Sequence, residues 1–142
     1  MAIMGPWTNA EVLVNAVDIS AWTTSVTIET SRDEVDVTAM GAVNKVTMPG
    51  LGDATIEIEV LQGFGAGEID ATMQPLSVTS TPFNVWVKPV KGTAISATNP
   101  QYQMSSLLFS YNPMDGGVGD AMKTTLTFKN AAQAGLVRDI TP

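Results

Sequence analysis

Paired carboxylates are the side chains of this sequence best suited to chemistry. Glu57 and Glu59 stand two residues apart in an alternating apolar and polar run, so in a strand they project from one face. Glycosidases use two carboxylates as acid and base, but these carboxylates come from different strands and flank a cleft. We therefore interpret Glu57 and Glu59 as part of a polar sheet face.

Two other groups of acidic residues are candidates for binding a cation. Asp33, Glu34 and Asp36 form one group, and Asp115 and Asp120 form the other. Neither group has the alternating spacing of oxygen ligands and the late glutamate of a calcium-binding EF-hand loop. Solvated loop carboxylates are the simpler interpretation, and we expect no metal and no other cofactor.

The glycine-rich segment Gly63-Phe-Gly-Ala-Gly67 lies between an expected strand and an expected helix, where phosphate-binding loops occur. Its spacing differs from the dinucleotide-binding fingerprint, and no Lys-Ser/Thr pair follows it. Glu68 and Asp70 at the start of the helix would repel a phosphate. We predict a flexible joint between strand and helix.

The absent residue types restrict the chemistry further. The sequence contains no cysteine and no histidine, which excludes disulfides, serine–histidine triads and histidine zinc sites. Its 14 acidic and 7 basic residues give a net charge of −7, which argues against a surface that grips nucleic-acid phosphates. Trp7, Trp22 and Trp86 are suited to stacking on sugars or bases, but core or interface anchors are the better interpretation. No catalytic site emerges, and we do not expect an enzyme.

Length and composition predict one domain, residues 1–142. The 142 residues are 44% hydrophobic, which is enough for a core. Residues 1–7 have no basic side chain before an apolar run, so we expect no secretory signal. No segment approaches the roughly 18–20 apolar residues of a membrane span, so we expect no membrane anchor.

Alternating Thr, Val, Ile and aromatic residues predict a mainly β fold. Strands are expected at Glu11–Ile19, Trp22–Thr30, Thr55–Val60, Phe83–Val90, Tyr102–Tyr111 and Met122–Lys129. One helix of about two turns is expected over Glu68–Pro75, with Pro75 ending it. The predicted core comprises Val26, Ile28, Ile56, Ile58, Val85, Val87, Leu126 and Phe128, covered by Ile69 and Met73 of the helix.

The segment Ser31–Gly52 is too long for a tight hairpin, and we expect a long loop. Four of its valines could form short extended arms within that loop. Loops of this length inside a compact domain are uncommon and usually functional.

The order of these segments resembles one family. The matching segments are Val17-Asp-Ile-Ser-Ala-Trp22, Thr24-Ser-Val-Thr-Ile28, Asp33–Gly41, Gly50–Ile58, Ile69-Asp-Ala-Thr-Met73 and Ser96-Ala-Thr-Asn-Pro100. From about Val17 to Arg138 they resemble the tail tube (major tail) proteins of long-tailed bacteriophages, especially the short single-domain kind found in phages of actinobacteria.

The resemblance implies a β-sandwich or partial barrel with one short helix, which completes a β-barrel on oligomerisation. Six copies would form a ring, and stacked rings would form a virion tail tube that conducts DNA without binding it specifically. Further implied partners are the tape measure protein and the tail terminator, with synthesis in the host bacterial cytoplasm. Because related tubes often have acidic channels, the resemblance places Glu29, Glu57 and Glu59 on the channel wall.

The family also has a long loop that reaches the neighbouring ring, and residues 31–52 are the candidate for it. The expected contact residues are Arg32, Asp33, Glu34, Val35, Asp36, Val37, Val43, Lys45 and Val46. Two alternatives stay open. One is a capsid-decorating or head–tail connector protein of a phage virion. The other is a carbohydrate-binding β-sandwich module that uses its tryptophans.

Overall fold

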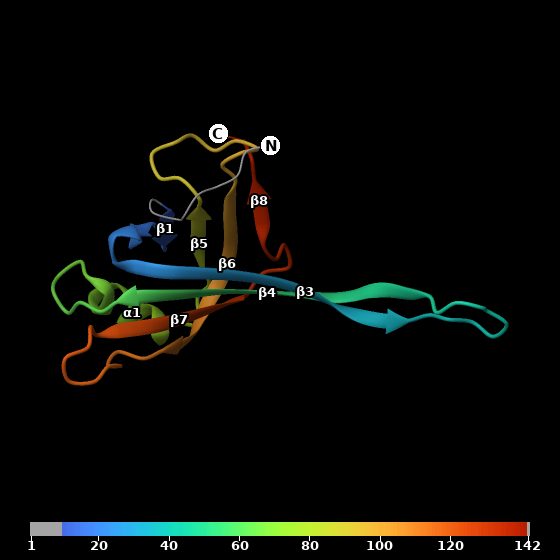
Figure 1. Ribbon diagram of the computed structural model, residues 1–142, viewed down its shortest axis with the longest axis horizontal. Coiled ribbons are helices and arrows are strands. Elements are labelled where there is room, and N and C mark those ends of the chain that lie inside the picture. The colour runs from blue at the N-terminus through green and yellow to red at the C-terminus, as the bar shows by residue number, and fades with distance from the viewer. Residues whose placement is uncertain (1–9, 142) are drawn as a thin grey trace.

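A computed structural model describes residues 10–141 of the chain (Figure 1). Its elements are β1 (Glu11–Val14), β2 (Val17–Asp18), the short 3-10 helix η1 (Ser20–Trp22), β3 (Thr23–Asp36), β4 (Thr47–Leu61), α1 (Ile69–Ser77), β5 (Phe83–Lys88), β6 (Gln101–Tyr111), β7 (Lys123–Asn130) and β8 (Val137–Asp139). The prediction of a mainly β fold with one short α-helix is confirmed.

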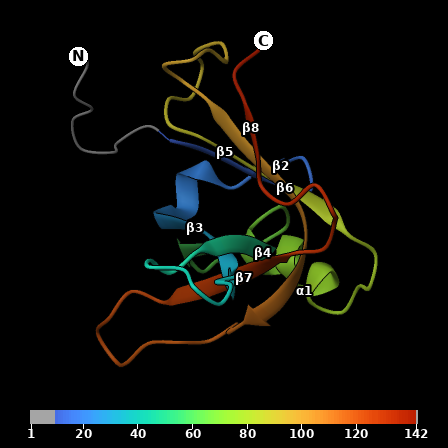
Figure 2. The ribbon, with the colours of Figure 1, turned by 90° about the vertical axis from the view of Figure 1, so that its right-hand side faces the viewer.

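The eight strands form one antiparallel sheet in the order β2-β1-β5-β6-β7-β4-β3, and β8 pairs with β6. The long strand β6 belongs to both halves of this sheet. Its residues from Tyr102 to Ser106 pair with β5, and those from Ser106 to Tyr111 pair with β7. The sheet bends along β6 and curls without closing, which gives the expected partial barrel (Figure 2).

The core lies inside this curl, and alternation along the strands explains its composition. Six of the eight predicted core residues are buried, together with Ile69, Met73 and Leu76 from one face of α1. Phe83 and Phe128 meet edge to face with ring centroids 5.9 Å apart. The other two predicted residues, Val26 and Ile28, are only half-buried but pack against the core. The reason is that β3 is the last strand of the sheet.

The sequence predicted that the helix ends at Pro75, and this prediction is wrong. The helix begins at Ile69 and continues to Ser77 with Pro75 inside it. Proline lacks the N–H that would bond to the carbonyl of Ala71, but both residues are exposed, so water can hydrate that carbonyl. Burial of Leu76 in the following position favours continuing the helix past the proline.

The predicted opening strand Glu11–Ile19 is a tight hairpin of β1 and β2. Asn15 and Ala16 connect the two strands and have positive φ angles of 50° and 67°. The strands pair Val14 with Val17 and Leu13 with Asp18. Two consecutive positive φ angles define a type I′ turn, whose twist matches that of the flanking strands. Asn is favoured at such a position, but Ala is not, which is why the sequence concealed the turn.

Residues 31–53 form a projecting two-stranded ribbon, which we call the arm (Figure 1). The sequence predicted a long loop with short extended arms, and the structure instead continues β3 and β4 far beyond their predicted bounds. Their pairing runs from Ser31↔Asp53 to Asp36↔Thr47. The Val37 N–H then donates to the Val46 carbonyl at 2.9 Å, so the hydrogen-bonded ladder nearly reaches the tip. Backbone pairing within the arm therefore supplies its local order.

Candidate functional site

Three sequence-predicted glutamates lie on one face of the sheet half formed by β3, β4 and β7. Glu57 stands between Thr27 of β3 and Thr127 of β7, because these residues are register partners. Glu59 and Glu29 share this face through the same alternation. The structure thus brings the three carboxylates together, and their apolar neighbours along β4 point into the core.

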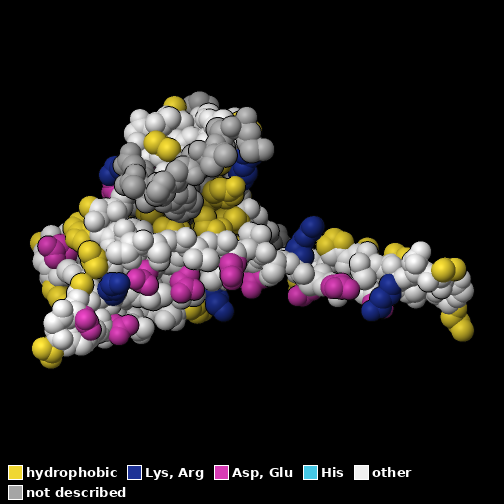
Figure 3. Space-filling view, viewed as in Figure 1, with side chains coloured by type: hydrophobic (Ala, Val, Ile, Leu, Met, Phe, Trp, Pro, Cys, Tyr) yellow, Lys and Arg dark blue, Asp and Glu magenta, His cyan; other side chains and the backbone are white. Residues whose placement is uncertain are grey.

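The same face also carries charged residues that sequence reasoning missed. Asp53 adds a fourth carboxylate, and β7 contributes Lys123 and Lys129 beside the glutamates. Lys123 Nζ lies 3.6 Å from Glu59 Oε1. Figure 3 shows acidic side chains in a row along the body with basic ones among them. Carboxylates outnumber ammonium groups four to two, so the face is acidic but mixed. The alternation of polar and apolar residues along β7 could have placed both lysines on this face, because Lys123, Thr125, Thr127 and Lys129 are two residues apart.

This sheet half ends in two open edges. On one side, β4 is the one strand among residues 10–141 that pairs with β3. On the other side, β5 pairs with β6 only as far as Ser106, and no strand within residues 10–141 pairs with the corresponding side of β6 from Leu107 to Tyr111. Unpaired N–H and C=O groups along such edges can pair with another chain.

The arm is exposed along its whole length. Every residue from 31 to 53 is exposed, so the arm adds nothing to the core. Its exposed large apolar side chains are Val35, Val37, Met40, Val43, Val46, Met48 and Leu51. A ribbon with this many exposed apolar groups is typical of a surface that another molecule covers.

The charges of the arm have few partners within the described part of the chain. Arg32, Asp33, Glu34 and Lys45 form no ion pair among residues 10–141. Hydrogen bonds from Thr38, which include its backbone N–H at 2.9 Å, hold the pKa of Asp36 below its usual value. The structure thus places all the sequence-predicted loop residues on one projecting element, where none of their charges forms an ion pair within residues 10–141.

The end of the body opposite the arm consists of two loops, residues 62–68 and 112–122 (Figure 1). Gln62 joins them, since its N–H donates to the Met122 carbonyl at 2.9 Å and its Nε2 donates to the Pro113 carbonyl at 2.7 Å. Tyr111 Oη donates to Asp70 Oδ1 at 2.7 Å and ties this end to α1. Burial, together with that hydrogen bond, raises the pKa of Tyr111.

The glycine-rich segment joins β4 to α1, as the sequence predicted, and a hydrogen bond within it holds its backbone. The Gly65 N–H donates to Glu68 Oε2 at 2.9 Å, so the glutamate carboxylate occupies the place where a bound phosphate would lie. A Cβ atom on Gly63 would collide with this carboxylate. Close packing around Glu68 therefore explains Gly63 and Gly65, whereas the positive φ of 77° explains Gly67.

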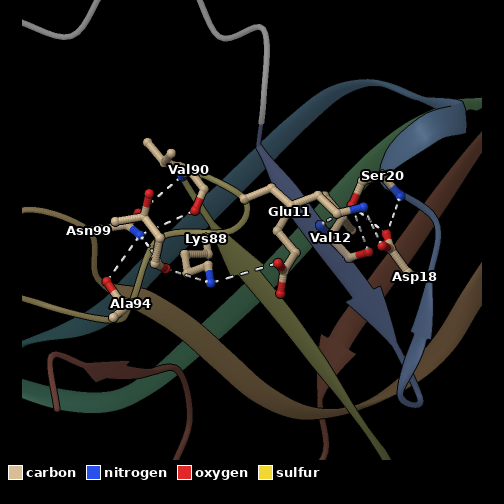
Figure 4. Close-up of polar contacts among 10 residues, drawn as sticks. Glu11, Val12, Asp18, Ser20, Lys88, Val90, Ala94 and Asn99 are labelled. Carbon is tan, nitrogen blue, oxygen red and sulfur yellow. Dashed lines mark hydrogen bonds and ion pairs between the residues drawn. The ribbon is translucent and has the colours of Figure 1, made fainter. Parts of the chain in front are cut away.

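Another polar cluster lies near β1 and the loop between β5 and β6 (Figure 4). The buried Asn99 side chain accepts from the Val90 N–H at 3.0 Å and donates to the Val90 carbonyl at 3.2 Å. Asp18 accepts from Lys91 and from Ser20. Partial burial raises the pKa of Asp18, but these hydrogen bonds outweigh that effect and lower it overall. These hydrogen bonds brace the loops around β1 and β5.

The remaining sequence candidates do not come together. Trp86 Nε1 donates to Gln103 Oε1 at 2.9 Å on the outer face of the sheet, whereas Trp22 packs against the core. Trp7 lies outside the described residues. Within residues 10–141 no three His, Cys, Asp or Glu side chains are grouped as metal ligands. Over the same residues, no helix has the length and apolar character needed to cross a membrane.

Comparison with protein families and with curated proteins finds no match. Solved structures do match in fold. A chain of the PVC sheath/tube terminator, from an extracellular contractile injection system in its extended state, has a TM-score of 0.74 at 15% identity and covers 97% of this chain and 98% of its own. A chain from the virion of a native gene transfer agent particle has a TM-score of 0.68 at 12% identity over 94% and 96%.

A third match is a chain from the tail of an empty gene transfer agent particle, refined with C6 symmetry. Its TM-score is 0.63 at 13% identity, over 85% of this chain and 83% of its own. At such identities the likeness establishes the fold alone. The resemblance to tail tube proteins is confirmed at that level: this chain has the fold found in chains of tail and tube assemblies.

Proposed function

We propose that the protein is a structural protein of a virion tail, in which copies assemble into rings of six that stack into the tail tube. The observation that carries this proposal is the arm, an entirely exposed ribbon that projects from a fold shared with chains of tail and tube assemblies. The C6 symmetry of one of those assemblies supports the ring of six. In this proposal residues 1–142 act as one domain, and its role requires no catalysis.

The open sheet edges support lateral assembly. The strands run antiparallel throughout the order β6-β7-β4-β3, so β3 and β6 point in opposite directions. The free edge of β3 in one copy can therefore pair antiparallel with the free edge of β6, from Leu107 to Tyr111, in the next copy. Repeated around a ring, this pairing closes a barrel of four strands per copy and removes both edges.

The acidic face of β3, β4 and β7 supports a channel wall. In a closed barrel, one sheet face packs on the core and the other lines the channel, and Glu29, Glu57 and Glu59 lie on the face away from the core. Excess carboxylates repel the phosphate backbone of DNA, so the genome would pass without specific binding. Lys123 and Lys129 reduce this repulsion without reversing its sign.

Electron microscopy of the purified protein tests the proposal. We expect rings of six and tubes of stacked rings. A protein that stays monomeric or trimeric at high concentration would overturn the tail tube proposal and favour a decorating protein. In an infected cell the assembled tube would also contact the tape measure protein and the tail terminator, and both should copurify with it.

Replacing Glu57 and Glu59 by Lys tests the channel wall. We expect folded subunits and normal tubes, because both side chains lie on the polar face, but slowed or blocked DNA release from virions. The matched control is the double substitution by Gln, which removes charge without reversing it and should have a smaller effect. Normal infectivity of the Lys variant, or a density map with both side chains on the outer wall, would contradict the assignment.

A terminal ring is a second candidate role. One matching structure is a sheath/tube terminator, and it covers nearly the whole of both chains. A terminator would form single rings that bind the end of a tube but do not stack on one another. Microscopy of the pure protein separates the two roles, because only a tube subunit grows into long polymers.

A further inference from the structure

We propose that Asp115 is a site of spontaneous backbone modification, at which its peptide link to Gly116 rearranges into a β-linked isoaspartyl bond. The inference goes beyond the proposed function and does not depend on it, because it concerns one loop within a single copy of the chain. It is carried by an exposed carboxylate, an exposed glycine N–H beside it, and a hydrogen bond to the carbonyl that joins the two residues.

Asp115 differs from every other aspartate and asparagine of the chain in the residue that follows it. Its neighbour is Gly116, whereas each of the others is followed by a residue that carries a side chain. The rearrangement requires the backbone nitrogen of the following residue to reach the carboxyl carbon, and a side chain on that residue obstructs the approach. Glycine has no Cβ and adopts the widest range of backbone angles, so it obstructs the approach least.

The loop that carries Asp115 stands away from the core. Every residue from 112 to 122 is exposed, and the loop projects from the end of the body opposite the arm (Figure 1). Gly116, Gly117 and Gly119 lie in it. Exposed loop tips rich in small residues move more freely than strands. The backbone at Asp115 can therefore reach the conformation in which its carboxyl carbon meets the following nitrogen.

The hydrogen bonds around Asp115 favour the reaction. Among residues 10–141 its carboxylate forms no ion pair and accepts no hydrogen bond, and the Gly116 N–H donates to no acceptor. The Asp115 carbonyl, in contrast, accepts from the Lys123 N–H at 3.1 Å. This carbonyl and the Gly116 nitrogen belong to one peptide group. Because the hydrogen bond draws electron density from that group, the Gly116 N–H loses its proton more readily and the nitrogen becomes a better nucleophile.

The reaction consumes and returns one water molecule. The Gly116 nitrogen forms a bond to Cγ of protonated Asp115, and the Cγ–OH bond breaks. The hydroxyl leaves as water with the proton from the nitrogen, which gives a cyclic succinimide. Water then adds to one of the two ring carbonyls. Breaking the bond from nitrogen to Cγ restores aspartate, whereas breaking the bond from nitrogen to the former main-chain carbonyl carbon leaves the chain linked through Cγ. Nothing is oxidised or reduced, and the final mass equals the initial mass.

The rearranged backbone is one methylene longer, although the start of the loop is fixed. The short hydrogen bond from Thr124 Oγ1 to the Asn112 carbonyl holds its first residue. Gln62 Nε2 holds the next residue, since it donates to the Pro113 carbonyl at 2.7 Å. The added length must therefore be taken up between these contacts and Lys123. We expect faster hydrogen exchange of the Lys123 amide after rearrangement, because its acceptor belongs to the rearranged residue.

Prolonged incubation of the purified wild-type protein at neutral pH tests the site. Electron-transfer fragmentation of the digested protein distinguishes the two linkages, and isoaspartyl methyltransferase labels the α-carboxylate that the rearrangement exposes. We expect isoaspartate at Asp115 to increase with time, through a succinimide that is lighter by one water. Asp120 is the internal control, because it is exposed in the same loop but is followed by Ala121. It should stay unmodified over the same period.

Two variants separate the causes. Asp115→Glu keeps the negative charge but requires a larger ring, so methyl labelling of this loop should be lost. Ala121→Gly gives Asp120 a following glycine, but among residues 10–141 no N–H donates to the Asp120 carbonyl. We therefore expect Asp120 in this variant to react more slowly than Asp115.

Three results would contradict the proposal. Absence of isoaspartate at Asp115 after prolonged incubation would overturn it, as would equal modification of Asp115 and Asp120 in the wild-type protein. Equal rates at the two aspartates in Ala121→Gly would contradict the assistance from Lys123. All three results are independent of ring and tube formation, which electron microscopy measures separately.

Discussion

The body and the arm are built from the same two strands but are stabilised by different forces. In the body, alternate residues of β4 from Ala54 to Val60 are buried, and α1 covers the core they form. In the arm, the same strand pairs with β3 in the same antiparallel way, but each side chain is exposed. Backbone pairing is therefore common to both regions, and apolar burial belongs to one of them. Since burial supplies most of the stability of a fold, the arm should be the part that opens first.

The junction between the two regions has its own local structure. The register of β3 and β4 shifts between Arg32 and Glu34, opposite Pro49 and Gly52. A Cβ atom on Gly50 would lie 3.0 Å from Val35 Cγ2 and 3.2 Å from Asp33 Cβ, so a larger residue there would crowd the partner strand. Such irregularities increase the local twist and bend the ribbon. They set the arm's direction relative to the body.

Deleting the outer arm should have the largest effect of any change considered. Removing Val35–Thr47 and joining the ends with Gly-Ser leaves the pairs of the body intact. We expect complete loss of tube growth, measured by electron microscopy and light scattering, and an unchanged thermal midpoint. Polymers of normal length from this variant would show that the arm has no role in assembly.

Hydrogen exchange gives a second measurement for the arm. An isolated two-stranded hairpin is marginally stable in water, so arm amides should exchange rapidly in free subunits and slowly in tubes. Body amides of β4 and β7 should be protected in both states. Equal protection of the arm before and after assembly would contradict a role in subunit contacts.

Truncating one side chain in each region should separate stability from assembly. Ile58 is fully buried, so Ile58→Ala should cost about 2–5 kcal/mol of the free energy of unfolding. Val43→Ala in the arm should leave that free energy unchanged, because Val43 is almost fully exposed, yet it should weaken tube growth. Urea denaturation of both variants provides the measurement. An unchanged midpoint for Ile58→Ala would mean that its strand face is wrongly assigned.

The body could be predicted from the sequence because burial imprints a period of two on its strands. Ile56, Ile58 and Val60 revealed β4, and Ile69, Met73 and Leu76 revealed one face of α1. The arm could not be predicted in this way, since no face of it is buried and its order comes from backbone pairing that any side chain permits. The hairpin at Asn15 was missed for a different reason, because Ala16 gives no signal for a positive φ.

The candidate assembly surfaces were predictable in part. Alternation alone placed Glu57 and Glu59 on the polar face, because their neighbours must reach the core. The open edge of β6 depends on where β5 begins. The packing of loops 62–68 and 112–122 depends on the contact of Gln62 with Pro113, which is 51 residues away in sequence. Contacts between distant segments leave no local pattern, so sequence reasoning had no means of finding them.

Substitutions between Ala and Gly at positions of positive φ test how much each hairpin contributes to the melting temperature. Ala16 holds φ of 67° in the β1–β2 turn, which costs an L residue about 1–2 kcal/mol, so Ala16→Gly should raise the melting temperature by a few degrees. Gly41→Ala introduces the same strain at the arm tip, where φ is 87°. It should leave the melting temperature unchanged, because unfolding of the body does not depend on the tip. Calorimetry of both variants checks this, and a melting temperature lowered by Gly41→Ala would show that arm and body unfold together.

Lowering the pH should produce the smallest difference between the two regions, measured as the change in the free energy of unfolding. The pKa of Asp18 is lowered in the folded body, so its stabilising contribution is complete above the unfolded pKa of about 3.9 and is lost as the pH falls through the folded pKa. Lys91 stays protonated throughout, because the ordinary pKa of lysine, about 10.4, lies far above this range and the hydrogen bond to Asp18 raises the pKa of Lys91 further. The pair is partly exposed, so Asp18→Asn should cost no more than about 1 kcal/mol at pH 7 and progressively less at lower pH.

Asp36 in the arm should behave differently, although its pKa is also lowered. Its hydrogen bonds join it only to Thr38, so protonation loosens the tip and leaves the core untouched. Nuclear magnetic resonance titration should find a low pKa for both aspartates. Urea denaturation between pH 7 and pH 3 should then show a pH-dependent loss for Asp18→Asn and none for Asp36→Asn. A matching loss for Asp36→Asn would mean that the arm shares the cooperative unfolding of the body, and the distinction between the two regions would fail.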